Sequence, residues 1–415
     1  MIYLDNAATG GFKPDCVISA ATAALNNSAN PGRSGHKLSL ACMERVYAAR
    51  NLLSDFFGGY GYERVVFTKN CTEALNIAIF SLLDGSNGTS GANAIEKSDC
   101  GGAPLIISTV AEHNSVLRPL ELLKKQGARV EYLPLNKDGD VDLTALEKIV
   151  DGNGGASGAG TIKKPGYGDV RGAARGNSVP RAAIITLASN VTGAAPDIKR
   201  IRRLLPDDCL LICDGAQACG HIPIDLKALG IDALAVAGHK GMLGVQGSGA
   251  LLFSDRFNPK PLTYGGTGSE SYNLDMPDFY PDRLESGTLN FPAIVSLAEG
   301  AMYLTHHLAR HRTVVESLTA ETIGKLSEIR GVEIFSRPNP FGIVAFRLEN
   351  MQSETAALAL SEEFEICVRG GLHCAPLMHK SLQSDGLIRA SFSAFTPPSG
   401  VEKLVSAVEA LTKRR

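Results

Sequence analysis

The sequence predicts an α/β protein with a mixed, mainly parallel sheet flanked by helices and a smaller C-terminal α/β domain. Three observations lead to this fold class. Short apolar runs alternate with helical segments from about residue 64 to 253, which is typical of parallel strands joined by crossover helices. The last two of these runs have no helix between them, so a mixed sheet is expected. After about residue 291 the regular alternation of strand and helix ends, and a long helical stretch leads into a second set of strands.

The expected strands of the large sheet are short and apolar, which is typical of strands covered on both faces. They lie at residues 65–67, 105–107, 130–133, 183–186, 210–213, 233–236 and 250–253. Helices are expected between most of them, at 72–83, 115–126, 143–150 and 197–205. Gly127 and Pro206 mark the ends of the second and fourth helices, because neither residue continues a helix well.

The C-terminal region is expected to form the smaller domain. Its elements are a long helix after 291, strands at 332–336 and 343–348, a helix near 354–363, a loop at 370–380, a strand at 388–393 and a closing helix from Val401. We therefore predict a large domain over 16–290 and a small domain over 291–415 that includes the segment 1–15. Residues 85–103 and 152–178 are rich in Gly and in small or polar residues, and they are predicted to be mobile insertions.

The composition argues against several classes of function. Lys plus Arg is 41 and Asp plus Glu is 43, and this balance gives no field that would attract nucleic acid or an acidic membrane. No apolar run approaches the roughly 20 residues that span a bilayer, and the N-terminus lacks a signal-peptide pattern. The nine cysteines are then expected to be free thiols in a reducing cytoplasm. No metal site is predicted, because Cys209, Cys213 and Cys219 are better interpreted as buried structural thiols.

Two motifs at the ends of expected strands carry an amine and an acid. Residues 237–241 read Ala-Gly-His-Lys-Gly, and desolvation of Lys240 would favour the neutral amine that forms a Schiff base. Asp214 and Gln217 follow a neighbouring strand, at the edge where α/β proteins bind ligands. An acid there suits the ring nitrogen of pyridoxal phosphate, because a protonated ring is the better electron sink. An exposed loop lysine and a turn-capping aspartate are the ordinary alternatives.

Two further motifs suit the rest of such a cofactor. Residues 68–74 read Thr-Lys-Asn-Cys-Thr-Glu-Ala and join a strand to a helix. The N–H groups at a helix N-terminus bind phosphate, and Thr72 adds a hydroxyl. His113 follows another strand, and an imidazole in that place is able to stack on a flat ring. A simple threonine N-cap and a structural histidine are the competing interpretations.

Two motifs in the C-terminal region suit a substrate. Residues 369–376 read Arg-Gly-Gly-Leu-His-Cys-Ala-Pro, a mobile loop that is able to deliver the Cys374 thiol. Arg369 and a nearby imidazole would favour the thiolate, whereas a lone cysteine is more often inert core. Arg389 lies within an expected strand. Its guanidinium would bind an amino-acid carboxylate by two hydrogen bonds, or else form a surface salt bridge.

Together and in this order, the motifs resemble those of the class V aminotransferases, a family of fold-type I pyridoxal-phosphate enzymes. Within it they look most like the cysteine desulfurase and selenocysteine lyase branch. The resemblance runs from residues 3–9, Tyr-Leu-Asp-Asn-Ala-Ala-Thr, to the final helix, and only the two expected insertions fall outside it. The run 369–375 resembles the branch with a short cysteine loop.

The resemblance implies a role for individual residues, with Lys240, Cys374 and His113 as the catalytic residues. Lys240 carries the cofactor covalently, Asp214 pairs with the ring nitrogen, and His113 stacks on the ring. The other implied cofactor contacts are His239 and Thr72 at the phosphate, Cys71 beside them, Thr288 at the partner subunit's phosphate, and Gln217 and Asn190 near the ring oxygen. The implied substrate contacts are Arg389, His36, Asn190 and Arg369.

The implied reaction converts L-cysteine to L-alanine and leaves the sulfur on Cys374 as a persulfide, which then passes to an acceptor protein or thiol. Pyridoxal 5′-phosphate, an obligate homodimer and a cytoplasmic location are expected. A selenocysteine lyase and another class V aminotransferase-type enzyme remain alternatives. Two departures affect local contacts: Ala237 stands where many relatives have a hydroxyl residue, and Phe395-Thr396-Pro397 replaces a common Tyr-Asn-Thr.

Overall fold

The computed structural model describes residues 1–83, 104–152 and 179–414. The two predicted insertions, 85–103 and 152–178, lie outside these residues apart from Gly152. Within the described ranges, no helix is long and apolar enough to cross a membrane.

The larger sheet has its strands in the order β2-β8-β7-β6-β5-β3-β4. β8 runs antiparallel to both of its neighbours, whereas the other neighbouring strands are parallel. The prediction of a mixed, mainly parallel sheet is therefore confirmed. The strands are β2 (Val65–Thr68), β3 (Leu105–Thr109), β4 (Arg129–Leu133), β5 (Pro180–Thr186), β6 (Leu210–Asp214), β7 (Ala233–Ala237) and β8 (Gly249–Phe253).

Both faces of this sheet are covered. In β6, Leu211 and Cys213 belong to one buried cluster and Ile212 belongs to another, because successive side chains of a strand point to opposite faces. The helices between the strands lie within three residues of their predicted bounds. They are α3 (Cys71–Phe80), α4 (Asn114–Lys125), α5 (Leu143–Val150) and α6 (Ile198–Leu204), followed by the short α7 (Leu226–Leu229).

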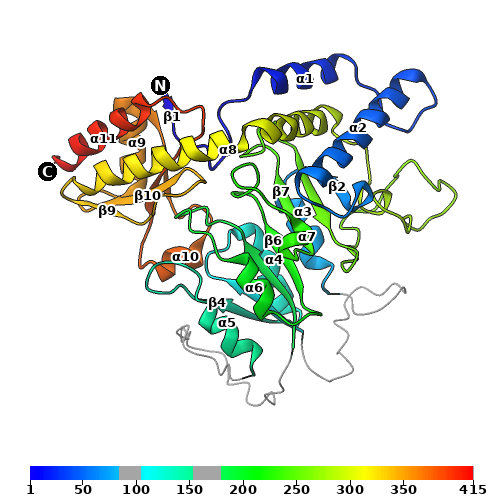
Figure 1. Cartoon of the computed structure of the whole chain (residues 1–415), viewed down its shortest axis with the longest axis horizontal. Helices are drawn as coiled ribbons and strands as arrows, with labels where there is room; N and C mark the ends of the chain where they lie inside the picture. The colour runs from blue at the N-terminus through cyan, green and yellow to red at the C-terminus, as the bar shows by residue number, and fades with distance from the viewer. Residues whose placement is uncertain (84–103, 153–178, 415) are drawn as a thin grey trace.

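A long helix, α8 (Phe291–Ser327), connects the two sheets. Figure 1 shows it running from α1 (Asp15–Asn26) and α2 (Lys37–Phe56) towards the smaller sheet. Its first half, up to Leu304, packs in the core of the large sheet, whereas Leu318 and Leu326 pack in the core of the small one. The predicted division at residue 290 stays a prediction.

The smaller sheet is antiparallel, with its strands in the order β12-β13-β10-β9. β1 pairs with β11 in a separate two-stranded parallel sheet, so the N-terminus lies beside the C-terminal region (Figure 1). The elements are β1 (Ile2–Tyr3), β9 (Val332–Ile334), β10 (Ile343–Leu348), α9 (Ser353–Phe364), β11 (Ile366–Cys367), β12 (Arg369–Gly371), α10 (Pro376–Ser381), β13 (Leu387–Ser391) and α11 (Ser399–Thr412). Two 3₁₀ helices, η1 (Tyr62–Arg64) and η2 (Asp282–Leu284), complete the described elements.

The prediction of a loop over 370–380 is wrong in part. The end of β12 and all of α10 except Ser381 lie within that range, and only residues 372–375 between them are irregular. The cysteine is therefore held on a short connection between two regular elements.

Candidate active site

The amine and the acid meet at one edge of the large sheet. β6 ends at Asp214 and the parallel neighbour β7 ends at Ala237, so Lys240 lies just beyond the carboxyl end of β7. Burial lowers the pKa of Lys240, although the charge of Asp214 opposes the shift. The structure therefore favours the neutral amine at Lys240 more than an exposed lysine would.

Asp214 is buried, with 2% of its surface exposed. Its Oδ1 accepts a hydrogen bond from Ala216 N at 2.9 Å and lies 3.4 Å from Cys71 Sγ. Asp214 thus caps the turn that follows β6, which is the ordinary alternative from the sequence, and the carboxylate is also held beside Lys240. Burial and the charge of Asp214 raise the pKa of Cys71, so this thiol stays protonated and donates to Oδ1.

The N-terminus of α3 follows the outer strand β2. Asn70 caps the helix, since its Oδ1 accepts from Glu73 N at 2.9 Å. Thr72 is exposed in the first turn, where free backbone N–H groups and the helix dipole favour an anion. The structure has the helix start that the sequence predicted, but the capping residue is Asn70, not Thr72. Phosphate binding there stays a prediction.

His113 caps α4, and its ring has a defined tautomer. Its Nδ1 accepts from Ser115 N at 3.1 Å, and because a backbone N–H can only donate, the neutral ring carries its proton on Nε2. Burial lowers the pKa of His113, so the ring is neutral near pH 7. His113 thus presents a flat, uncharged imidazole with a single N–H donor.

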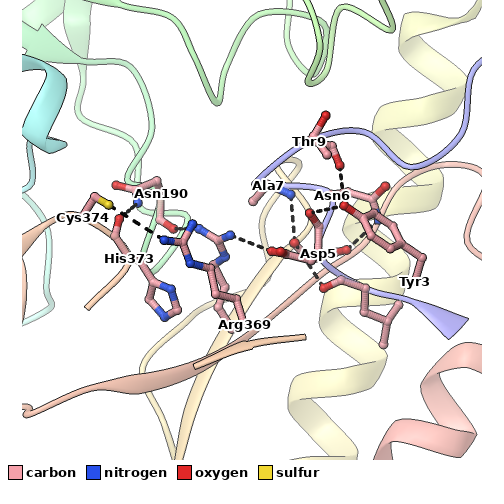
Figure 2. A network of polar contacts seen from close by, with 12 residues as sticks. Tyr3, Asp5, Asn6, Ala7, Thr9, Asn190, Arg369, His373 and Cys374 are labelled. Carbon is pink, nitrogen blue, oxygen red and sulfur yellow. Dashed lines mark hydrogen bonds and ion pairs between the residues drawn. The ribbon is translucent and has the colours of Figure 1, made fainter. Parts of the chain in front are cut away.

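Two hydrogen bonds tie the backbone carbonyls of the thiol loop to segments that follow strands of the large sheet. Asn190 Nδ2 donates to His373 O at 2.7 Å, and Asn114 N donates to Cys374 O at 2.7 Å. Figure 2 shows Cys374 beside Arg369, with Arg369 Nη2 3.9 Å from the sulfur. A guanidinium at that distance attracts a thiolate.

His373 does not supply the charge that the sequence suggested for the thiol. Its side chain is buried and its Nε2 lies 3.0 Å from Leu387 O, on the side of β13. Burial and the nearby charges of Arg389 and Arg369 keep the pKa of His373 far below its usual range. The ring is therefore neutral, and Arg369 is the cation that contacts Cys374.

Arg389 is buried in β13, with 1% of its surface exposed. Its Nη2 lies 2.8 Å from Asp5 Oδ1, and its Nη1 donates to Asn190 O at 2.9 Å. Its Nε has no hydrogen-bond partner among the described residues. The surface salt bridge proposed as an alternative is therefore wrong, because the arginine is held inside the protein.

Segment 3–9 contains contacts that the sequence reasoning did not assign. Asp5 pairs with Arg389, Ala7 O accepts from Gln217 Nε2 at 3.0 Å, and Thr9 Oγ1 lies 3.0 Å from His239 Nδ1. Figure 2 shows this segment on the far side of Arg369 from Cys374. The run was recognised as a motif, and that was the only available signal, because its partners lie more than 200 residues away.

Two predicted residues are not joined to this cluster. His36 is exposed and caps α2, where its Nδ1 accepts from Ser39 N at 3.3 Å. Thr288 is exposed between η2 and α8. Their roles at the substrate and at a partner's phosphate stay predictions.

A cleft of about 880 Å³ opens elsewhere, and its walls do not include Lys240, Asp214 or Cys374. It is lined by residues 134–140, 192–195, 334–341 and 381–382. Cleft volume alone would therefore direct attention away from the chemistry. The residue types and their contacts identify the site at the sheet edge.

The clustered residues fit pyridoxal phosphate. The ligand needs an amine for its aldehyde, an acid for its ring nitrogen and a helix N-terminus for its phosphate. Lys240, Asp214 and the start of α3 are these three groups, and they lie at the ends of β7, β6 and β2 of one sheet. The unpartnered, buried Nε of Arg389 adds a donor for an anion.

The family model for class-V aminotransferases matches residues 2–155 and 177–404. The chain belongs to this family. Its members use pyridoxal phosphate, and their fold is the fold-type I architecture predicted from the sequence.

Curated relatives and solved structures of class-V aminotransferases agree with the match. A "Probable cysteine desulfurase" of Methanothermobacter thermautotrophicus is 30% identical, over 98% of this chain and 94% of that one. A protein of the same name from Pyrococcus abyssi is 28% identical, over 100% and 94%. The apo cysteine desulfurase of Thermococcus onnurineus superposes with a TM-score of 0.81 at 28% identity, over 99% and 94% of the two chains. Cysteine desulfurase CsdA of Escherichia coli gives 0.80 at 25%, over 98% and 94%.

Proposed function

We propose that this class-V aminotransferase is a pyridoxal-phosphate-dependent cysteine desulfurase that converts L-cysteine to L-alanine. The observation that carries the proposal is the setting of Cys374. Its sulfur lies beside Arg369, in a loop bonded to Asn190 and Asn114, which follow strands β5 and β3. A transaminase has no need of such a thiol. The names of the similar proteins support the same reaction.

Four residues and the start of α3 would hold the cofactor. Lys240 would hold its aldehyde carbon, Asp214 its ring nitrogen and Gln217 its ring oxygen, while His239 and the start of α3 would hold its phosphate. Bound in this way, the cofactor withdraws electrons from the substrate and so weakens the Cα–H bond. Cys71 donates a hydrogen bond to Asp214 Oδ1 and so helps to fix the carboxylate.

Lys240 is the proposed base. Because burial lowers its pKa, its Nζ is able to accept the Cα proton of the substrate once the amine is free. A positioned base of this kind typically contributes roughly 10²–10⁴ in rate. His113 lies at the start of α4, which follows β3 of the same sheet. As the Nε2–H tautomer, it would present one N–H donor to the bound cofactor or substrate.

Arg389 is the proposed carboxylate-binding residue. Asp5 and Asn190 fix its two terminal nitrogens, and the free Nε and the remaining N–H donors are left for the substrate. A guanidinium suits this task because its planar donors match a carboxylate. Asn190 joins this group to the thiol loop, since its side chain holds His373 O.

The Cys374 thiolate is the proposed sulfur acceptor. It attacks the substrate sulfur, so an S–S bond forms and the substrate's C–S bond breaks. One thiol and L-cysteine thus give a persulfide and L-alanine, and neither an oxidant nor a reductant is consumed. A protein or small thiol then takes the sulfur from Cys374.

We also propose a homodimer in the cytoplasm. Large apolar side chains are exposed on α1, α2 and the segment before η2, which suits a surface covered by a second copy. They include Leu25, Leu40, Met43, Tyr264, Tyr272 and Leu274. All described cysteines are free thiols, in keeping with a reducing compartment.

An assay with L-cysteine and a reductant tests the proposed function. We expect alanine and sulfide in equal amounts from the wild type. Cys374→Ala should keep the yellow colour of the cofactor and lose sulfide release by about a hundredfold or more, whereas the same change at the buried Cys42 should leave release intact. Sulfide release at the wild-type rate by Cys374→Ala, or pyruvate formation from alanine and a keto acid as the main activity, would overturn the proposal.

The ratio of activities with L-cysteine and L-selenocysteine separates the closest alternative. The C–Se bond is weaker than the C–S bond, so a lyase acting on selenocysteine depends less on an acceptor thiol. An equal loss of both activities in Cys374→Ala favours the desulfurase.

A further inference from the structure

The imidazole of His239 has a polar partner from the N-terminal segment. His239 lies between β7 and Lys240, and its Nδ1 is 3.0 Å from Thr9 Oγ1. Either atom is able to donate, so the contact alone leaves the tautomer open. The tautomer matters because only a ring with its proton on Nε2 presents an N–H donor on its other side.

The backbone carbonyl of His239 is the other acceptor within reach of the Thr9 hydroxyl. Gly10 N already donates to His239 O at 2.9 Å. Lys13 Nζ lies 3.4 Å from the same oxygen and has a shorter contact, 2.8 Å, with Gly10 O. Thr9 Oγ1 also lies near that oxygen, but at 3.3 Å it is farther from it than from Nδ1.

We infer that the Thr9 hydroxyl donates to His239 Nδ1 and thereby fixes His239 as the Nε2–H tautomer, the form that donates to a phosphate monoester. Thr9 is a positioning residue, since it acts on the phosphate through His239. The inference rests on the proposed function, in which His239 contacts the cofactor phosphate.

The charge state of His239 agrees with this geometry. Burial, and to a smaller extent the neighbouring lysines Lys240 and Lys13, lower the pKa of His239 to about 4. The ring is therefore neutral near pH 7, and its single proton lies on either Nδ1 or Nε2. A charged imidazolium would donate from both nitrogens and would not need Thr9.

The same segment therefore reaches two ends of the site. Asp5 holds Arg389, where the substrate carboxylate is proposed to bind, and Thr9 holds His239, where the phosphate is proposed to bind. Tyr3 ties the two together, because its hydroxyl lies 3.1 Å from Asp5 O and 2.9 Å from Thr9 O (Figure 2).

Nitrogen NMR of the holoenzyme reads the tautomer directly. With ¹⁵N-labelled histidine, and the His239 signals assigned by their absence in His239→Gln, we expect a pyridine-like Nδ1 and a pyrrole-like Nε2. A pyrrole-like Nδ1 overturns the inference. Because this readout does not depend on turnover, it remains decisive even where the desulfurase reaction is not observed.

Cofactor release from the holoenzyme tests the consequence. Thr9→Val removes the hydroxyl at nearly constant shape and should speed the loss of pyridoxal phosphate on dilution by about tenfold. Thr9→Ser keeps the donor and should stay within about twofold of the wild type. Equal release from Thr9→Val and Thr9→Ser overturns the inference, whereas a wild-type chain that never binds pyridoxal phosphate overturns the proposed function instead.

Discussion

Arg389 is the residue whose surroundings say most about the substrate. It is buried, it is held by Asp5 and Asn190, and its Nε has no partner among the described residues. Lysine would keep the positive charge but has no planar set of donors. A lysine at position 389 would therefore lose hydrogen bonds that the arginine is able to make.

Arg389→Lys should raise the KM for L-cysteine by about tenfold to a hundredfold, with a smaller change in kcat, because a two-point contact with the carboxylate is lost. Steady-state kinetics check this. Arg347→Lys is the matched control, since Arg347 lies on the neighbouring strand β10 and pairs with Glu333 near the surface. An unchanged KM in Arg389→Lys would remove Arg389 from the substrate site.

The sequence was sufficient to predict site residues whose type and position after a strand indicate their chemistry. Lys240 and Asp214 follow apolar strands, and the strand alternation alone brings them to one edge. It was not sufficient for Asp5 and Thr9, because their contacts span 384 and 230 residues. It also misjudged His373, since nothing in the run 369–376 tells which way that ring points.

Among the elements, the lysine loop depends on close backbone packing against the turn after β6. Gly220 has a φ of +82°, and a Cβ there would lie 2.2 Å from Gly241 O, next to Lys240. Gly139 has nearly the same φ, +80°, but a Cβ there would meet no atom within 4 Å. An alanine would have the same backbone strain at both positions, but it would meet close neighbouring atoms only at position 220.

Gly220→Ala should therefore lower the free energy of unfolding by about 3 kcal/mol or more, and should shift the cofactor absorbance as the Lys240 loop moves. Gly139→Ala should cost only about 1 kcal/mol, the strain of a positive φ. Urea unfolding and an absorbance spectrum measure both effects. Equal losses of unfolding free energy in the two variants would mean that the lysine loop moves away from the added Cβ at no cost in stability, which would contradict the close packing described here.

Sequence patterns predicted elements with clear flanking breaks better than the two elements around Cys374. α5 and β10 have the predicted bounds, because each is flanked by clear breaks in the pattern. β12 has three residues and α10 has six, which is too short for hydrophobic periodicity to register. These two elements hold Cys374, so the part of the fold nearest the thiol was the part least visible in the sequence.

At the scale of the whole molecule, several histidines are kept neutral. The pKa values of His221 and His311 are lowered from 6.5 to about 4 by burial and by neighbouring histidines, and burial also lowers the pKa of His373. Above pH 6.5 each ring is neutral in both the folded and the unfolded chain. Below pH 6.5 the unfolded chain binds protons that the folded chain does not.

The free energy of unfolding should therefore fall as the pH is lowered from about 6.5 to 4. Glu112 acts in the opposite direction, since burial raises its pKa to about 8. It is one group against six described histidines whose pKa values are lowered, since burial acts in the same way on His113, His239 and His379. Urea unfolding at a series of pH values measures the slope, and His311→Gln should make it shallower. A stability that rises on acidification in this range would contradict the assignment of neutral histidines.

Residues from both sheets surround one thiol. The large sheet provides Lys240 and Asp214, the small sheet provides Arg369 and Arg389, and Asn190 and Asn114 hold the cysteine loop between them. The central claim is that this arrangement exists to move sulfur to Cys374.

Mass spectrometry after a single turnover tests that claim most directly. The holoenzyme is mixed with one equivalent of L-cysteine and no reductant, then digested and mapped. We predict one added sulfur atom on the peptide that contains Cys374, one alanine per sulfur, and no added sulfur in Cys374→Ser. Alanine formed while the Cys374 peptide stays unmodified would contradict the account.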